Sequence, residues 1–128
     1  MNELTNNVNW LAVLVGTIAG FALGWLWYSP FLFGRKWAEG SRVEPGDASS
    51  MPAAALSVQL VATFFLALLV GITAAQNALL TAILILLTVA CFIVAGGLFV
   101  RKTSFAVLVD GSFILAMGAV MILVQGIF

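Results

Sequence analysis

Long uninterrupted runs of apolar residues dominate the chain. Residues 8–28, 53–73, 79–100 and 105–127 form four such runs, and the first three contain no charged residue. A helix needs about 20 mainly apolar residues to cross a hydrocarbon core of roughly 30 Å. The pattern therefore predicts an all-α membrane protein, a bundle of four transmembrane helices that forms a single domain over residues 1–128.

The polar connections between these runs differ in length and composition. Residues 29–52 form the long connection, and its beginning, residues 31–37, has the pattern of a short amphipathic segment that lies flat in the membrane interface. Residues 44–47 read Glu-Pro-Gly-Asp, which is typical of a β-turn. The connections at 74–78 and 101–104 are short, so the helices that they join are expected to run antiparallel.

All five Lys and Arg residues lie in two of the three connections. They are Arg35, Lys36 and Arg42 in the first connection, and Arg101 and Lys102 in the third. In a bundle with four spans these two connections share one side, and the positive-inside rule makes that side cytoplasmic. We therefore predict cytoplasmic loops at residues 29–52 and 101–104, with both termini outside.

Composition supports a membrane location and narrows the chemistry. The chain of 128 residues is 63% hydrophobic and 8% charged, whereas about 25% of a soluble domain is charged. Its equal numbers of basic and acidic residues suggest no nucleic-acid partner. With one cysteine and no histidine, we expect no metal site and no cofactor. The N-terminus lacks the basic start of a signal peptide, so the first run is expected to remain as a span.

Small residues recur at helical spacing within the predicted spans. The first span carries Ala12, Gly16, Gly20 and Gly24 at every fourth position, a spacing that lets helices approach closely in lipid. This stripe is interpreted as packing within one subunit, and the alternative is the seam of a homo-oligomer. Further packing glycines are predicted in the second and fourth spans, at Gly71, Gly111 and Gly118.

The remaining spans also carry polar or small stripes that are expected to face protein rather than lipid. Gln59 begins the stripe of the second span, where a structural hydrogen bond is the default interpretation and a pore-lining position the alternative. The third span shows Thr81, Thr88 and Ala95 at heptad spacing.

Asp110 is the sharpest chemical feature, because it is the one charged residue within the four apolar runs. A carboxylate inside a span costs about 2.5–3.5 kcal/mol at the bilayer centre. Asp110 lies only about two helical turns beyond Arg101 and Lys102, so either cation is expected to reach it and form a structural pair. The functional alternative is a proton or cation site.

Aromatic residues gather at both ends of the first span. They are interpreted as anchors in the membrane interfaces, with Trp10 on one side and Trp25, Trp27, Tyr28 and Trp37 on the other. Pro30, which follows them and stops the helix, is assigned to the same interface. If the protein has a site, we expect it where the hinge after Tyr28 meets the start of the fourth span. The anchor interpretation is the one that we favour.

Two segments carry a family resemblance. Val-Asn-Trp-Leu-Ala at 8–12, Gly24, Trp-Tyr-Ser-Pro at 27–30, Phe33-Gly34 and Trp37, together with Asp110, Gly111, Phe113 and Met-Gly-Ala at 117–119, resemble the domain of unknown function 1761 family. The resemblance implies four spans and a bacterial inner membrane. That family has no established activity, so the resemblance implies no mechanism.

Two functions remain open on the sequence. The first is a non-enzymatic, self-associating helix bundle that acts as a scaffold or accessory subunit, with the lipid bilayer and a second copy or another membrane protein as partners. The alternative is a small ion- or proton-coupled transporter or channel that uses Asp110. An enzyme is not expected, because one intramembrane carboxylate without histidine offers too few catalytic groups.

Overall fold

A computed structural model describes residues 7–29, 32–41 and 53–128, and the described residues form helices and turns without strands. Four helices are long and apolar enough to cross a membrane, which confirms the predicted all-α fold with four spans. They are α2 (Trp10–Trp27), α4 (Ala53–Ala75), α5 (Leu79–Phe99) and α6 (Ser104–Ile127). The short helix α3 (Gly34–Ser41) lies between the first two.

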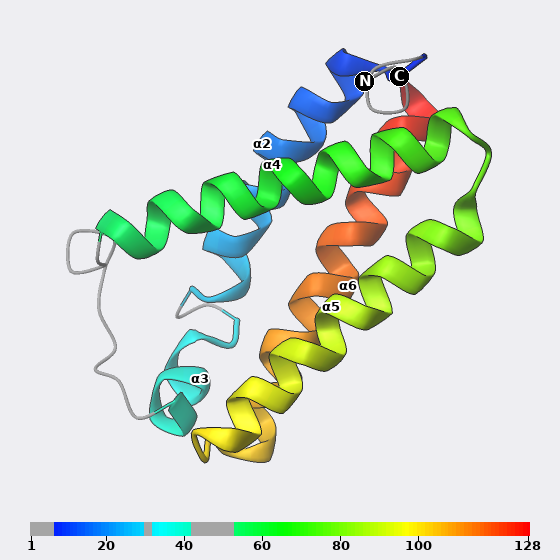
Figure 1. The fold of residues 1–128 in the computed structure, drawn as a ribbon. Helices are drawn as coiled ribbons and strands as arrows, with labels where there is room; N and C mark the ends of the chain where they lie inside the picture. Colours follow the sequence, from blue (N-terminus) through cyan, green and yellow to red (C-terminus); the bar gives the residue numbers. More distant parts are fainter. Residues whose placement is uncertain (1–6, 30–31, 42–52) are drawn as a thin grey trace.

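Helix α6 is the centre of the bundle, because it contacts α2, α3, α4 and α5. Figure 1 shows α5 and α6 side by side, whereas α4 crosses α2 and diverges from α5 beyond the turn that joins them. The start of α2 and the end of α6 lie at one end of the bundle, and α3 and the α5–α6 connection lie at the other. We call this second end, formed by α3 and residues 100–103, the cation-bearing end.

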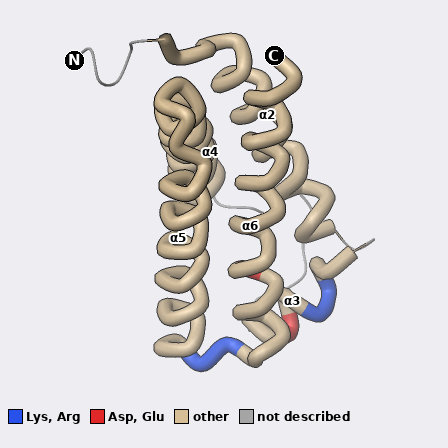
Figure 2. The backbone as a smooth tube through the Cα atoms, turned by 90° about the vertical axis from the view of Figure 1, so that its right-hand side faces the viewer, with Lys and Arg blue, Asp and Glu red and all other residues tan. Residues whose placement is uncertain are grey.

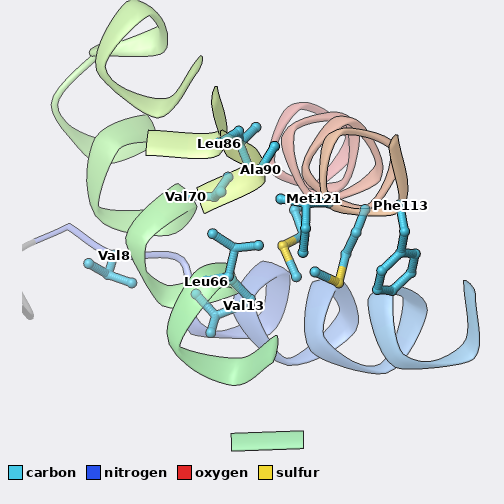
Figure 3. Packing of buried hydrophobic residues seen from close by; sticks show 11 residues of the cluster. Val8, Val13, Leu66, Val70, Leu86, Ala90, Phe113 and Met121 are labelled. Atoms are coloured by element: carbon cyan, nitrogen blue, oxygen red, sulfur yellow. The ribbon is translucent and has the colours of Figure 1, made fainter. Parts of the chain in front are cut away.

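Apolar side chains from four helices fill the space around α6 (Figure 3). Met117 and Met121 of α6 are almost fully buried, and both are unbranched side chains that fill irregular gaps. The same cluster includes Val13, Leu66, Val70, Leu86, Ala90, Phe113 and Ile114.

The glycine stripe of α2 faces α6 of the same chain. A Cβ atom added at Gly20 would lie 2.9 Å from Cγ of Met117, and one at Gly24 would lie 3.2 Å from Cζ of Phe113. Gly16 faces Met121 in the same way, at 3.5 Å. A homo-oligomer would therefore need a face other than this stripe.

The other predicted packing positions also lie at helix contacts. Ala12 is buried, and an added Cβ at Gly71 would lie 2.8 Å from Val13 Cγ2. Gly111 approaches Val94, where the added atom would be 2.8 Å from Cγ2. An added Cβ at Gly118 would overlap the side chain of Leu86, so α5 and α6 approach closely there.

The stripe prediction is wrong for α5 within this chain. Thr81, Thr88 and Ala95 are exposed on its outer face. The face that meets α6 instead carries the buried residues Ala82, Leu86, Ala90 and Gly97. Ala82, Ala90 and Gly97 are small, as a close helix contact requires, and Leu86 packs against Gly118 of α6. A heptad count alone cannot distinguish the two faces of α5.

Helix boundaries lie close to the predicted spans, and the largest shift concerns the amphipathic segment. The sequence predicts that segment at residues 31–37, whereas α3 occupies Gly34–Ser41. Its buried residues are Gly34, Ala38 and Gly40, and Arg35, Lys36 and Glu39 are exposed. Pro30, Arg42 and the β-turn predicted at 44–47 lie outside the described residues.

Candidate functional site

Asp110 lies on α6 near the cation-bearing end of the bundle and is buried, with 9% of its surface exposed. Helix α6 begins after Thr103, whose side chain accepts a hydrogen bond from the backbone N–H of Ala106 at 3.2 Å. Asp110 is thus about 9 Å along the helix from Ser104, at a rise of 1.5 Å per residue.

Three side-chain donors from other parts of the chain converge on the Asp110 carboxylate. The Tyr28 hydroxyl donates to Oδ1 at 2.6 Å, and the indole Nε1 of Trp37 donates to the same oxygen at 2.8 Å. Lys102 Nζ lies 3.0 Å from Oδ2 and forms an ion pair with it. We call these four residues the Asp110 centre; it joins the end of α2, helix α3 and the α5–α6 connection to α6.

Lys102, rather than Arg101, is the cation that reaches Asp110. The chain leaves α5 with Arg101 in a left-handed conformation, at a φ of 63°, and the N–H of Lys102 donates to the Gly97 carbonyl at 3.0 Å. This hydrogen bond closes the helix end as in a Schellman motif. Lys102 Nζ also lies 5.3 Å from the centroid of the Trp37 ring, and Arg101 is exposed.

Aromatic rings surround the carboxylate on the side of α2 and α3. The Tyr28 ring meets the Trp37 ring edge-on at 4.9 Å and the Phe113 ring at 5.5 Å. Trp27 Nε1 donates to the Val109 carbonyl at 3.1 Å, next to Asp110 in the chain. These rings limit the access of water to the carboxylate, which strengthens its ion pair and its hydrogen bonds.

A tight hinge between α2 and α3 places Tyr28 and Trp37 on the same side. The Gly34 N–H donates to the Ser29 carbonyl at 2.9 Å. A Cβ added at Gly34 would overlap the backbone of Tyr28 and Ser29, so the hinge requires glycine there.

Helix α3 is tied to α6 at a second point. The N–H of Thr103 donates to the Gly40 carbonyl at 3.1 Å. A Cβ at Gly40 would overlap Thr103 Oγ1 and lie 2.9 Å from Cβ of Ala106, so the two backbones touch closely. Together with the Trp37 hydrogen bond, this contact holds α3 against the end of the bundle.

Chemically, this arrangement stabilises an ionised carboxylate by charge and by hydrogen bonds. Two donors occupy Oδ1 and an ammonium group occupies Oδ2, which offsets the cost of burying the charge. Among the described residues, no group of three or more His, Cys, Asp and Glu side chains lies close enough together to hold a metal ion.

The other predicted site residues lie outside the Asp110 centre. Gln59 is exposed on α4, in a stretch of ten residues from Ala53 that contains no buried residue. Trp10 and Trp25 are exposed at 47% and 44%, and a position in the membrane interface stays a prediction for both.

Sequence reasoning missed the hydrogen bonds that Trp27, Tyr28 and Trp37 make to α6. The anchor interpretation treats these side chains as contacts to lipid, whereas all three are partly buried and donate to α6. Part of the signal for these contacts is in the sequence, because the predicted spans put the hinge after Tyr28 and the carboxylate of Asp110 at the same end of the bundle. Which aromatic donor reaches the carboxylate depends on the hinge geometry, which spacing does not reveal.

Among the described residues, hollows that Asp110 does not line occur elsewhere on the surface. One lies near the α4–α5 turn, where Thr73, Asn77 and Gln125 contribute polar groups. Another is a shallow apolar groove on the outer face of α5, next to Thr88 and Cys91.

Fold and site together define a class: an all-α chain with four helices able to span a membrane and a buried carboxylate centre at one end of the bundle. Residues 11–126 match the family described as "Protein of unknown function (DUF1761)", and the chain belongs to that family. The match includes all four residues of the Asp110 centre. No curated protein and no solved structure matches the chain.

Proposed function

We propose that this chain is a non-enzymatic, multi-pass protein of the bacterial cytoplasmic (inner) membrane that acts as a self-associating scaffold or accessory subunit. In this proposal the connections at residues 29–52 and 101–104 are cytoplasmic and both termini are outside. The distribution of the cations supports this orientation, because every Lys and Arg lies in those two connections.

We favour a structural role over transport because both oxygens of the Asp110 carboxylate already have partners within the chain. Its two oxygens receive donors from Tyr28, Trp37 and Lys102. A carboxylate that carries an ion or a proton through a transport cycle must exchange its partners. Here the loss of Tyr28, Trp37 or Lys102 as a partner would also release the segment of the chain to which that residue belongs. The geometry supports a centre that holds the cation-bearing end together.

The outer face of α5 is the surface that we propose for self-association. Thr88, Cys91 and Ala95 are exposed there, and an added Cβ at Gly96 would meet nothing within 4 Å. Small side chains allow two helices to approach closely in lipid, where packing drives association. The glycine stripe of α2 is already covered by α6.

Flux measurements in reconstituted vesicles separate the scaffold from the transporter. We expect vesicles with the wild type and with Asp110→Asn to show the same background flux of protons, alkali cations and halides as empty vesicles. Flux in the wild type that Asp110→Asn abolishes would contradict the proposal. Ser112→Ala is the matched control, because the exposed Ser112 hydroxyl bonds only to the Val109 carbonyl of its own helix, at 3.1 Å.

Mass measurement in a native-like lipid environment tests self-association separately. The wild type is expected to form an oligomer, and Ala95→Leu is expected to shift it toward monomer by separating the α5 helices. Leu123→Phe on the exposed face of α6 should leave the oligomer unchanged. A monomeric wild type would show that the self-association proposal is wrong.

A further inference from the structure

Three exposed cations gather at the cation-bearing end without an ion-pair partner among the described residues. Arg35 and Lys36 are exposed on α3, and Arg101 is exposed in the α5–α6 connection. Figure 2 shows the basic segments of α3 and of the α5–α6 connection toward the same end of the bundle. Lys102 differs from these three, because Asp110 neutralises it. The described part of this end carries one exposed acid, Glu39.

Large apolar side chains lie exposed next to these cations. Phe99 and Val100 directly precede Arg101 and are 87% and 67% exposed, and Leu32 before α3 is 47% exposed. A surface that presents apolar side chains beside cations matches the boundary between acyl chains and phosphate groups in a bilayer. The exposed cations are therefore at the level of lipid headgroups when the bundle spans a membrane.

The backbone at Arg101 adds a second observation. Its φ of 63° belongs to the left-handed region, where glycine is the least strained residue. The N–H of Arg101 donates to the Leu98 carbonyl at 3.0 Å, so the conformation is part of the helix ending. An arginine at this position projects a cation from the end of α5 at a conformational cost that glycine would avoid, which points to a use for its charge.

Lys36 is held close to the same connection. Its Nζ lies 4.9 Å from the centroid of the Phe105 ring, at the start of α6. Helix α3 itself is fixed by the Trp37 hydrogen bond to Asp110 and by the bond between Gly40 and Thr103. These contacts keep the cations of α3 at the same end of the bundle as those of the α5–α6 connection (Figure 2).

We propose that Arg35, Lys36 and Arg101 form a binding surface for the phosphate groups of anionic phospholipids in the surrounding leaflet. In the described part of this end, three cations face one exposed acid, which favours a lipid with net negative charge over a zwitterionic lipid. Binding at this surface does not depend on whether the protein acts as a scaffold or as a transporter, so its test is independent of the flux measurement.

The test compares two fluorescent lipids with the same acyl chains, phosphatidylglycerol and phosphatidylcholine, titrated against the full chain in mixed micelles at low salt. We expect the wild type to bind phosphatidylglycerol more tightly. Arg35→Gln/Lys36→Gln and Arg101→Gln should each weaken its binding by about fivefold for every cation removed. Binding of phosphatidylcholine should not change.

Two further variants separate charge from folding. Arg101→Gly removes the charge while relieving the left-handed backbone, so it should weaken phosphatidylglycerol binding without loss of thermal stability. Glu39→Gln removes the opposing charge and should maintain or increase the preference for phosphatidylglycerol.

Three results would overturn the proposal. They are equal wild-type affinity for the two lipids, an unchanged preference in folded Arg35→Gln/Lys36→Gln and Arg101→Gly, and displacement of phosphatidylglycerol by low millimolar inorganic phosphate. The last result would indicate a site for free anions instead of lipid headgroups.

Discussion

Asp110 shows at the residue scale how a membrane helix accommodates a charge. The carboxylate accepts hydrogen bonds from a phenol and an indole, and it pairs with an ammonium group. The phenol and the indole come from segments that are distant in the sequence, and the ammonium group comes from the connection just before α6. Removal of one partner leaves the others buried and less well paired, which costs more than the bond itself contributes. The residues of the Asp110 centre should therefore behave as a coupled unit.

Substitution of Tyr28 tests this coupling. Tyr28→Phe keeps the aromatic ring and removes the 2.6 Å hydrogen bond to Asp110. We expect the free energy of unfolding to fall by about 1 kcal/mol, in the range of polar contacts between membrane helices. Equilibrium unfolding in mixed micelles measures the change.

A double-mutant cycle and a matched control complete the test. In Tyr28→Phe/Asp110→Asn the loss should be smaller than the sum of the two single losses, because Asp110→Asn replaces the charged acceptor of the Tyr28 hydrogen bond by a weaker neutral one and so affects the same interaction. Ser29→Ala is the control, since the exposed Ser29 hydroxyl donates only to the nearby Leu26 carbonyl. Strict additivity would indicate that Tyr28 and Asp110 do not interact in the folded protein.

At the scale of helices, small residues decide which faces meet. Gly96 and Gly97 are neighbours on α5 with opposite surroundings. An added Cβ at Gly97 would lie 2.5 Å from Cγ1 of Val107, whereas one at Gly96 would meet nothing within 4 Å. Of these two glycines, only Gly97 is therefore needed for the close contact between α5 and α6.

This difference predicts opposite effects for two conservative substitutions. Gly97→Ala should lower the free energy of unfolding by about 1–3 kcal/mol, because α5 must move away from α6 or Val107 must shift. In the monomeric protein, Gly96→Ala should raise it by about 0.5–1 kcal/mol, because the added methyl group meets nothing else in the same chain within 4 Å and alanine favours a helix. Unfolding of both variants in the same micelles checks the pair, and equal effects would contradict the described α5–α6 contact.

The helices could be predicted from the sequence far better than their faces. The runs of apolar residues set the number and approximate bounds of the long helices, because length and hydropathy alone decide whether a segment can span lipid. Faces were less predictable, since α5 has small residues on two sides and only the position of α6 determines which side is buried. The sequence predicts the pair of Asp110 with a nearby cation, but the anchor interpretation favoured for the aromatic residues does not predict the indole and phenol donors, which depend on the hinge at Gly34.

At the scale of the whole molecule, the cation distribution predicts one orientation in the membrane. Single cysteines at Asn77 and at Glu39, in a Cys91→Ser background, report on opposite ends of the bundle; both native residues are exposed. A maleimide that cannot cross membranes should label position 77 in intact cells and position 39 only after the cells are opened. Labelling of position 39 in intact cells would indicate the reverse or a mixed orientation.

We conclude above all that one carboxylate, that of Asp110, joins several segments of the chain at one end of the bundle. Hydrogen–deuterium exchange in native-like lipid measures that role most directly, by comparing the wild type with Asp110→Asn and with the control Ser112→Ala. We predict that Asp110→Asn lowers the protection of α3 amides about tenfold, equivalent to about 1.4 kcal/mol of lost contact, and leaves the centres of α2 and α6 protected. Unchanged protection of α3 in a folded Asp110→Asn protein would contradict the assignment of Asp110 as the residue that holds α3 on the bundle.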